Sequence, residues 1–263
     1  MTGTGSIPST TYPIICDLDG VIWLADAAIP GSADAVARLR QAGHRVVFVT
    51  NFSFGLPSEI EEKLATHGIA AVGEVVTSAQ AAVALVRAGE RVQVCAGPGV
   101  RSEVERRGAI VVDRKAPADA VIVGFHRTFD YDAMRWAATA VRQGARLIGT
   151  NDDATYPTPG GPIPGGGAIL ASVATGAGVA PVVAGKPYAP MADLVRELLG
   201  PLPAGTIMVG DRPDTDGRFA RSLGCRFGLV HTGVIRPGER VEPVPELEAA
   251  DLAALADLVL AGR

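Results

Sequence analysis

The chain has 263 residues, of which 48% are hydrophobic, enough to bury the core of one large α/β unit or of two smaller lobes. Its net charge is -4 and it contains no basic run, which argues against a nucleic-acid or an anionic-membrane partner. No apolar segment approaches the roughly 20 residues of a membrane span, and the polar first residues show no secretory signal. The cysteines Cys16, Cys95 and Cys225 stand singly in apolar segments, which predicts a reduced, cytoplasmic protein.

Short β-branched segments alternate with alanine-rich amphipathic segments along most of the chain, which is the pattern of a parallel α/β fold. The predicted strands cover residues 14–16, 45–50, 75–77, 91–96, 119–124, 146–150, 182–184, 207–209 and 227–231. The predicted helices cover residues 32–41, 57–67, 79–87, 100–107, 132–143, 169–175, 188–199, 215–223 and 252–260. A chain of this length fits two lobes better than one sheet. The glycine- and proline-rich stretch 150–167 is longer than an ordinary α/β connection, as functional loops commonly are, and residues 1–11 are expected to be a disordered tail.

Two carboxylates follow the first predicted strand directly, in the order Asp17-Leu18-Asp19-Gly20. A buried strand end tolerates two charges only if a cation compensates them, so this pair favours a divalent-metal site that also carries a nucleophile. A calcium loop of the EF-hand type does not fit, because its glycine comes sixth and here the glycine comes fourth. By itself the motif leaves a metal site and a chance surface turn about equally open.

Ligands bind outside the carboxyl ends of the strands in an open α/β sheet. Four predicted strands end in polar groups, which are Asp17 and Asp19, then Thr50 and Asn51, then Lys186, then Asp211 and Asp216. Each group alone has a structural explanation as a helix cap or a turn. All four in this order, each closing an apolar strand, favour one shared site. Lys186 stands out further, because only three of the 24 basic residues are lysines.

The order D-x-D-G-V, T-N, G-K-P and G-D-x-x-x-T-D resembles the haloacid dehalogenase (HAD) superfamily. More closely, it resembles the capped branch, subclass IIA, that holds p-nitrophenyl, phosphoglycolate, pyridoxal and glycerol-phosphate phosphatases. The resemblance extends from residue 14 to residue 233 and includes the glycine-rich turn at 164–168. It implies a Rossmann-like HAD core domain with a parallel sheet at 12–78 and 181–263, and an inserted α/β cap domain at 79–180.

The resemblance also implies the roles of the polar residues. Asp17 would attack phosphorus and form an aspartyl-phosphate, and Asp19 would act as general acid and then as general base. Thr50, the amide of Asn51 and Lys186 would bind the phosphoryl oxygens, where the charge of the transition state lies.

The metal implied by the resemblance is Mg²⁺, a hard ion that takes oxygen ligands. An oxygen of Asp17, the main-chain carbonyl of Asp19 and the carboxylate of Asp211 would hold it. Asp216 would orient that coordination without contacting the ion.

The sequence therefore predicts a cytoplasmic, Mg²⁺-dependent hydrolase of small phosphate monoesters such as phosphosugars, glycerol phosphate or phosphoglycolate. A phosphatase of pyridoxal phosphate or nucleotides is the alternative. A non-catalytic sensor of phosphate ligands is an alternative of another class, against which the intact set of Asp17, Asp19, Lys186 and Asp211 argues. The expected partner is a small phosphorylated metabolite, and a homodimer formed through the cap is one option.

The segment 151–161 resembles the family's substrate-specificity region. Asp153 and Tyr156 are expected to contact the substrate, and carboxylates at Asp152 and Asp153 would bind hydroxyls and favour glycerol or sugar phosphates over flat aromatic ones. A solvated connector is the alternative for this loop.

Three features depart from the family pattern or imitate another one. Phe52 and Phe54 would either make the site entrance apolar or pack beneath the cap, and Gly217 would loosen the helix that follows Asp216. The segment 95–99 imitates a dinucleotide fingerprint but lacks its third glycine, so an ordinary strand-to-helix turn is predicted.

Overall fold

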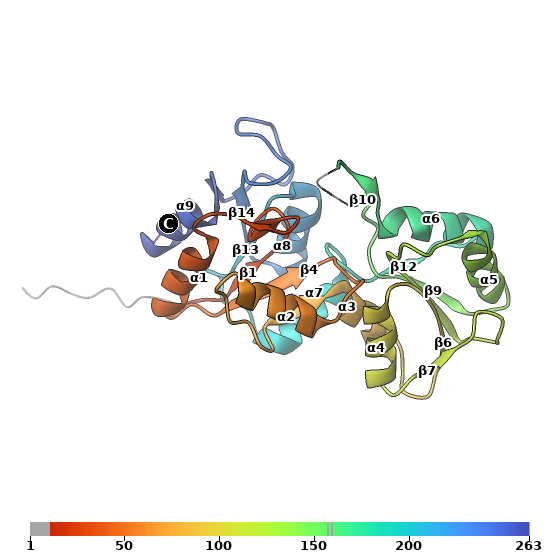
Figure 1. The fold of residues 1–263 in the computed structure, drawn as a ribbon. Coiled ribbons are helices and arrows are strands. Elements are labelled where there is room, and N and C mark those ends of the chain that lie inside the picture. Colours follow the sequence, from red (N-terminus) through yellow and green to blue (C-terminus); the bar gives the residue numbers. More distant parts are fainter. Residues whose placement is uncertain (1–10, 157, 159, 263) are drawn as a thin grey trace, which may run out of the picture.

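The computed structural model describes residues 11–156, 158 and 160–262, which form two α/β parts, each built around a parallel sheet (Figure 1). The predicted α/β class with parallel sheets is confirmed. The expected tail at residues 1–11 lies outside the described residues, except for Thr11. No helix in the described part of the chain is both long and apolar enough to span a membrane.

The first part contains a sheet of six strands. They are β1 (Ile14–Cys16), β4 (Val46–Thr50), β5 (Val75–Thr77), β13 (Ile207–Gly210), β14 (Arg226–Val230) and β15 (Leu247–Ala249). All neighbours are parallel, in the order β15-β14-β13-β1-β4-β5. The strand that carries the first motif, β1, thus lies in the interior of the sheet.

Both faces of this sheet are covered, so β1 is apolar at every position. Ile14 and Cys16 pack in a cluster with α1 (Ser32–Gln41), α2 (Pro57–Thr66) and α9 (Leu252–Leu260). Ile15 packs in the opposite cluster with α3 (Ser78–Ala84), α7 (Ala189–Leu199) and α8 (Arg218–Leu223). Alternate residues of a strand point to opposite faces, and a parallel sheet covered on both sides needs apolar residues at all of them.

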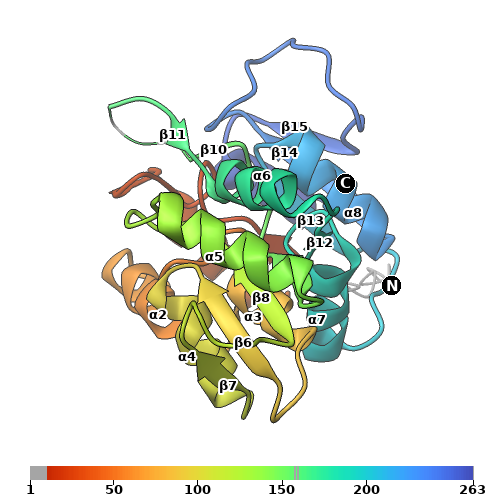
Figure 2. The ribbon, with the colours of Figure 1, turned by 90° about the vertical axis from the view of Figure 1, so that its right-hand side faces the viewer.

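The second part contains a sheet of five strands. They are β6 (Arg91–Cys95), β7 (Ile110–Val112), β8 (Ala120–Val123), β9 (Arg146–Gly149) and β12 (Val182–Val183), all parallel, in the order β12-β9-β8-β6-β7. The helices α5 (Tyr131–Arg142) and α6 (Gly166–Ala177) lie side by side over one face (Figure 2). The helix α4 (Pro98–Arg106) packs against the other face.

The chain passes into this second part after α3 and returns to the first part before α7. The domain division expected from the sequence, at 78/79 and 180/181, remains a prediction, and β12 lies just beyond residue 180 while pairing with β9. One hydrophobic cluster contains Ile15 and Val47 of the first sheet together with Val92 and Ile122 of the second, because α3 contributes buried alanines and the buried Val83 between them.

The elements that the sequence did not predict are short or lie at edges. They are β7, β15, and the two antiparallel pairs β2 (Trp23–Leu24) with β3 (Ala27–Ala28) and β10 (Thr155–Tyr156) with β11 (Ile163–Pro164). A strand of two residues is too short to show an alternating pattern.

The helix predicted over 215–223 begins later in the structure, at Arg218, because Pro213–Gly217 forms a π-type turn that precedes α8. A Cβ at Gly217 would lie 2.6 Å from Cγ of Pro243, so this glycine makes room for a proline ring.

Candidate active site

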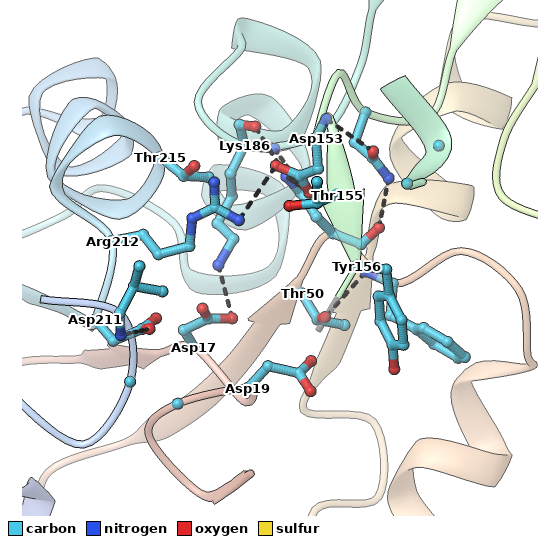
Figure 3. Close-up of a pocket in the computed structure, with 18 of the residues that line it drawn as sticks. Asp17, Asp19, Thr50, Asp153, Thr155, Tyr156, Lys186, Asp211, Arg212 and Thr215 are labelled. Atoms are coloured by element: carbon cyan, nitrogen blue, oxygen red, sulfur yellow. Dashed lines mark hydrogen bonds and ion pairs between the residues drawn. The ribbon is translucent and has the colours of Figure 1, made fainter. Parts of the chain in front are cut away.

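The carboxyl ends of three core strands bring the predicted motifs together. β1 pairs with both β4 and β13, so Asp17, Thr50 and Asp211 follow or end neighbouring strands. A cavity of about 370 Å³ opens at these ends (Figure 3). Of the predicted site residues, it is lined by Asp17, Asp19, Thr50, Asn51, Asp153, Tyr156, Lys186 and Asp211. Asp216 is fully buried and contacts the lining residue Lys186.

Lys186 joins two of the carboxylates. Its Nζ lies 2.7 Å from Oδ1 of Asp17 and donates a 2.7 Å hydrogen bond to Oδ1 of Asp216, and its side chain is 2% exposed. Burial alone would lower the pKa of this amine, but the two carboxylates outweigh burial and raise it. Lys186 is therefore a fixed buried cation beside Asp17.

Asp17, Asp211 and Asp216 form a cluster in which one oxygen of each lies within 4.8 Å of the others. Oδ2 of Asp211 accepts a 3.0 Å hydrogen bond from the amide of Val234, whereas no described residue gives its buried Oδ1 a hydrogen-bond partner. Burial and the neighbouring carboxylates raise the pKa of Asp211 to about 8. A buried oxygen without a donor beside further carboxylates fits a bound divalent cation.

Asp216 and Asp19 occupy different positions relative to this cluster. Both oxygens of Asp216 are engaged, Oδ1 by Lys186 and Oδ2 by the amide of Arg212 at 3.1 Å, so its carboxylate is held by protein groups. The carboxyl of Asp19 accepts a 3.1 Å hydrogen bond from Nε1 of Trp23, and burial raises its pKa. The Asp19 side chain thus belongs to the pocket wall outside the three-carboxylate cluster.

Asn51 positions Lys186 in a way that the sequence did not predict. Its Oδ1 accepts a 2.7 Å hydrogen bond from the amide of Lys186, and its Nδ2 donates to the carbonyl of the same residue at 3.1 Å. Nδ2 also donates to Oδ2 of Asp153 at 3.0 Å. Thr50 is buried, and its Oγ1 accepts from the amide of Phe52 at 3.0 Å.

The loop after β9 reaches the pocket, as expected, but its carboxylates have protein partners. Asp153 is bonded to Asn51 and lies 3.9 Å, Oδ1 to Nη1, from Arg212. Asp152 accepts a hydrogen bond from the hydroxyl of Tyr188. The role of hydroxyl binding assigned to these carboxylates remains a prediction.

Three aromatic rings line the same pocket. The ring of Tyr156 stacks on Phe125, with centroids 5.6 Å apart and planes at 25°, and lies 6.3 Å from the ring of Phe52. Burial, with the charge of Asp19, raises the pKa of Tyr156 to about 12. Tyr156 is therefore a neutral aromatic wall of the pocket.

The structure places the two phenylalanines differently. Phe52 lines the pocket, whereas Phe54 packs against Phe125 with centroids 6.1 Å apart and accepts a 2.8 Å backbone hydrogen bond from Gly99 of α4. The segment 95–99 is the strand-to-helix turn that was predicted, since it joins β6 to α4.

Sequence reasoning missed Arg212 and Phe125. Arg212 follows Asp211 directly and lines the pocket beside Asp153, but the motif suggested only a turn there. For Phe125 the sequence predicted no role in the site. Both residues could have been found from their positions at strand ends, because Phe125 comes shortly after β8 and Arg212 shortly after β13.

Comparison with known proteins identifies the family. A model described as haloacid dehalogenase-like hydrolase matches residues 14–110, and one described as HAD-hydrolase-like matches residues 183–255. The chain is 33% identical over 226 residues to the 5'-nucleotidase YutF of Bacillus subtilis, covering 84% of this chain and 88% of that protein. It is 34% identical over 224 residues to an acid sugar phosphatase of Staphylococcus saprophyticus, covering 84% and 86%. The crystal structure of a glycerol phosphate phosphatase of Mycobacterium tuberculosis in complex with calcium matches with a TM-score of 0.84 and 32% identity, over 94% of this chain and 76% of that one.

The fold and the site define a hydrolase with a parallel-sheet core, a second α/β part and a centre of carboxylates around a buried lysine. The chain belongs to the haloacid dehalogenase-like hydrolases, and the predicted capped phosphatase branch is confirmed. The prediction of a phosphoric monoester hydrolase is confirmed with it. Phosphatases of this family generally depend on a divalent metal, with which the carboxylate cluster agrees.

Proposed function

We propose that the protein hydrolyses small phosphate monoesters with Mg²⁺ and through an aspartyl-phosphate on Asp17. The observation that carries this proposal is the position of Asp17 between the buried ammonium of Lys186 and the oxygen of Asp211 that has no donor among the described residues. A cationic centre next to a carboxylate nucleophile lowers the repulsion between that carboxylate and an anionic phosphate ester.

Asp17 is the nucleophile in this proposal. Its Oδ1 accepts hydrogen bonds from the amide of Leu18 at 2.8 Å and from Lys186, and we assign its Oδ2 as the attacking atom. The new bond joins Oδ2 to phosphorus while the bond from phosphorus to the ester oxygen breaks. Asp19 donates a proton to that oxygen and then takes a proton from the water that attacks phosphorus and frees Asp17.

Thr50, the amide of Asn51 and Lys186 hold the phosphoryl oxygens, and the metal would be held by Asp17, the main-chain carbonyl of Asp19 and Asp211. The metal supplies positive charge next to the phosphoryl group when it is bound. Asp216 stays outside the coordination, because both of its oxygens already accept protein hydrogen bonds.

The second α/β part acts as a cap in this proposal, with the core at 12–78 and 181–263 and the cap at 79–180. Its residues Phe125, Asp153 and Tyr156 line the pocket together with core residues. Such a cap restricts the site to small esters and excludes water from the reacting groups. We further propose a cytoplasmic location, which unpaired cysteines support, and dimerisation through the cap.

Relatives named as a 5'-nucleotidase, an acid sugar phosphatase and a glycerol phosphate phosphatase support a small phosphorylated metabolite as the substrate. The test is phosphate release from a panel of such esters by the purified protein with Mg²⁺, with Asp17→Asn as the control. Release by the wild type but not by the variant is expected. Absence of release from every ester would contradict the proposal.

A further inference from the structure

A second cavity adjoins the proposed reaction centre. It has a volume of about 210 Å³ and shares four lining residues with the pocket that contains Asp17, namely Asp19, Thr50, Phe52 and Tyr156. In Figure 3 the carboxyl of Asp19 extends toward the side of the pocket on which Tyr156 lies. Since Asp19 is the proposed proton donor to the departing oxygen, the group attached to that oxygen is expected to lie on the side of the second cavity.

The walls of the second cavity are mainly apolar and aromatic. Besides Phe52 and Tyr156, its apolar lining residues are Leu18, Trp23, Phe54 and Ile60. Its charged residues have protein partners, because Glu59 accepts a 2.8 Å hydrogen bond from the amide of Leu56. Nζ of Lys63 donates to the carbonyl of Ala25 at 2.8 Å and lies 4.4 Å from the ring centroid of Trp23. The cavity therefore offers apolar contact area more than free hydrogen-bonding groups.

The carboxylates suited to recognising a polyol are engaged elsewhere. Asp153 bonds to Asn51 and faces Arg212, and Asp152 accepts from Tyr188. A polyol that bound to these carboxylates would have to displace their protein partners. An apolar group that moves from water into the second cavity gives up no hydrogen bonds.

We propose that the second cavity is the subsite for the departing alcohol, that this alcohol is apolar and carries a ring, and that Phe52 selects it. This inference rests on the proposed phosphatase function and on Asp19 as its acid. Phe52 comes from the core and Tyr156 from the cap, with ring centroids 6.3 Å apart and planes at 39°, so the two rings contact the same bound group from different parts of the molecule. Aromatic side chains of this kind bind flat or cyclic apolar groups through contact area and ring stacking.

The first test compares esters that differ in their alcohol but not in the chemistry of the broken bond. Benzyl phosphate, cyclohexylmethyl phosphate and glycerol 3-phosphate are all esters of primary alcohols, so their departing oxygens need a proton to a similar degree. We expect kcat/KM of the wild type to be at least about tenfold higher for both ring esters than for glycerol 3-phosphate. Equal values, or a preference for glycerol 3-phosphate, would overturn the inference.

The second test assigns the selection to Phe52. The ratio of kcat/KM for benzyl phosphate to that for glycerol 3-phosphate is expected to fall about tenfold in Phe52→Ser and to stay closer to the wild type in Phe52→Leu. The control is Trp136→Leu, which removes a ring that lies beside Arg135 and Lys115 and outside both cavities, and it should keep the wild-type ratio. A wild-type ratio in folded Phe52→Ser would overturn the role of Phe52.

The outcomes distinguish this inference from the proposed function. Hydrolysis of glycerol 3-phosphate with rejection of both ring esters would leave the phosphatase proposal intact and end only the subsite proposal. Absence of hydrolysis of any ester would end both. If Phe52→Ser does not fold, which a melting curve reports, the wild-type comparison still decides the subsite, and a ratio in Phe52→Leu that equals the wild-type ratio would overturn the role of Phe52.

Discussion

Asn51 holds the backbone of Lys186 at two points, accepting from its amide at 2.7 Å and donating to its carbonyl at 3.1 Å. The two residues are 135 positions apart in the chain, and one follows β4 while the other follows β12. These two hydrogen bonds fix the position of the Lys186 backbone, from which the side chain extends to place its ammonium beside Asp17.

The variant Asn51→Ala should lower kcat by roughly 10- to 100-fold, because the backbone groups of Lys186 lose buried partners worth about 1–3 kcal/mol and the ammonium shifts. Steady-state kinetics on any ester that is turned over measures this. The matched control is Ser78→Ala, which removes a 2.6 Å hydrogen bond to the carbonyl of Asn51 without touching Lys186. An equal loss in both variants would mean that Asn51 supports the fold and not Lys186.

The variant Asp17→Asn should fold with a melting temperature near that of the wild type but lose essentially all activity. An amide does not attack phosphorus, and positioning alone does not supply the rate enhancements of up to ~10²¹ that phosphate-ester hydrolysis requires. Rapid-quench detection of a phosphorylated protein should succeed with the wild type and fail with the variant. If the variant kept a tenth of the wild-type turnover, the covalent route would be wrong.

The variant Asp19→Asn should distinguish substrates by the basicity of the departing oxygen. Loss of a general acid costs about 10²–10⁴-fold for alkyl phosphates, whereas the nitrophenolate of p-nitrophenyl phosphate leaves with little need of a proton. The measurement is kcat for both esters in both proteins. Similar losses on the two esters would assign Asp19 to structure or metal binding alone.

Removal of the metal by EDTA should abolish activity, and Mg²⁺ should restore it, while Ca²⁺ should inhibit because it takes more ligands in a looser geometry. Metal binding can also be measured without activity, from the melting temperature. Mg²⁺ should raise the melting temperature of the wild type but that of Asp211→Asn much less. Full activity after exhaustive chelation would rule out the metal.

The variant Gly233→Ala should weaken the apparent affinity for Mg²⁺ about 10- to 100-fold, as loss of a group that positions a ligand commonly does. A Cβ at Gly233 would lie 1.8 Å from Oδ2 of Asp211, so the carboxylate has to move. Titration of activity with Mg²⁺ measures the change. In the control Gly176→Ala, the new Cβ meets only Cβ of Ala138 at 3.4 Å, and the affinity should stay that of the wild type.

The sequence predicted the strands that are long and fully buried, such as Val46–Thr50, because apolar β-branched runs between turn residues have few other interpretations. It could also group Asp17, Thr50, Lys186 and Asp211, since each closes such a strand and the carboxyl ends of parallel strands share one edge. Grouping these residues did not require the order of the strands in the sheet.

The partners of the polar groups could not be predicted in the same way. That Asn51 bonds Lys186, or that Tyr188 bonds Asp152, depends on how segments more than thirty residues apart pack in space. No periodic pattern records such contacts. For the same reason the sequence suggested free carboxylates at Asp152 and Asp153, whereas in the structure Asp152 accepts from Tyr188 and Asp153 accepts from Asn51. The rings that line the second cavity were not predicted either.

The cluster that joins Ile15 of the first sheet to Ile122 of the second through α3 has a consequence for how a substrate reaches Asp17. A large rotation of one sheet against the other would expose these buried side chains to water, at a cost of roughly 25 cal/mol for each Å². The described residues of the β10–β11 hairpin contribute no side chain to that cluster, and its Thr155 and Tyr156 line the pocket. Admission and release of ligands are therefore expected to use bending of this hairpin rather than opening of the whole molecule.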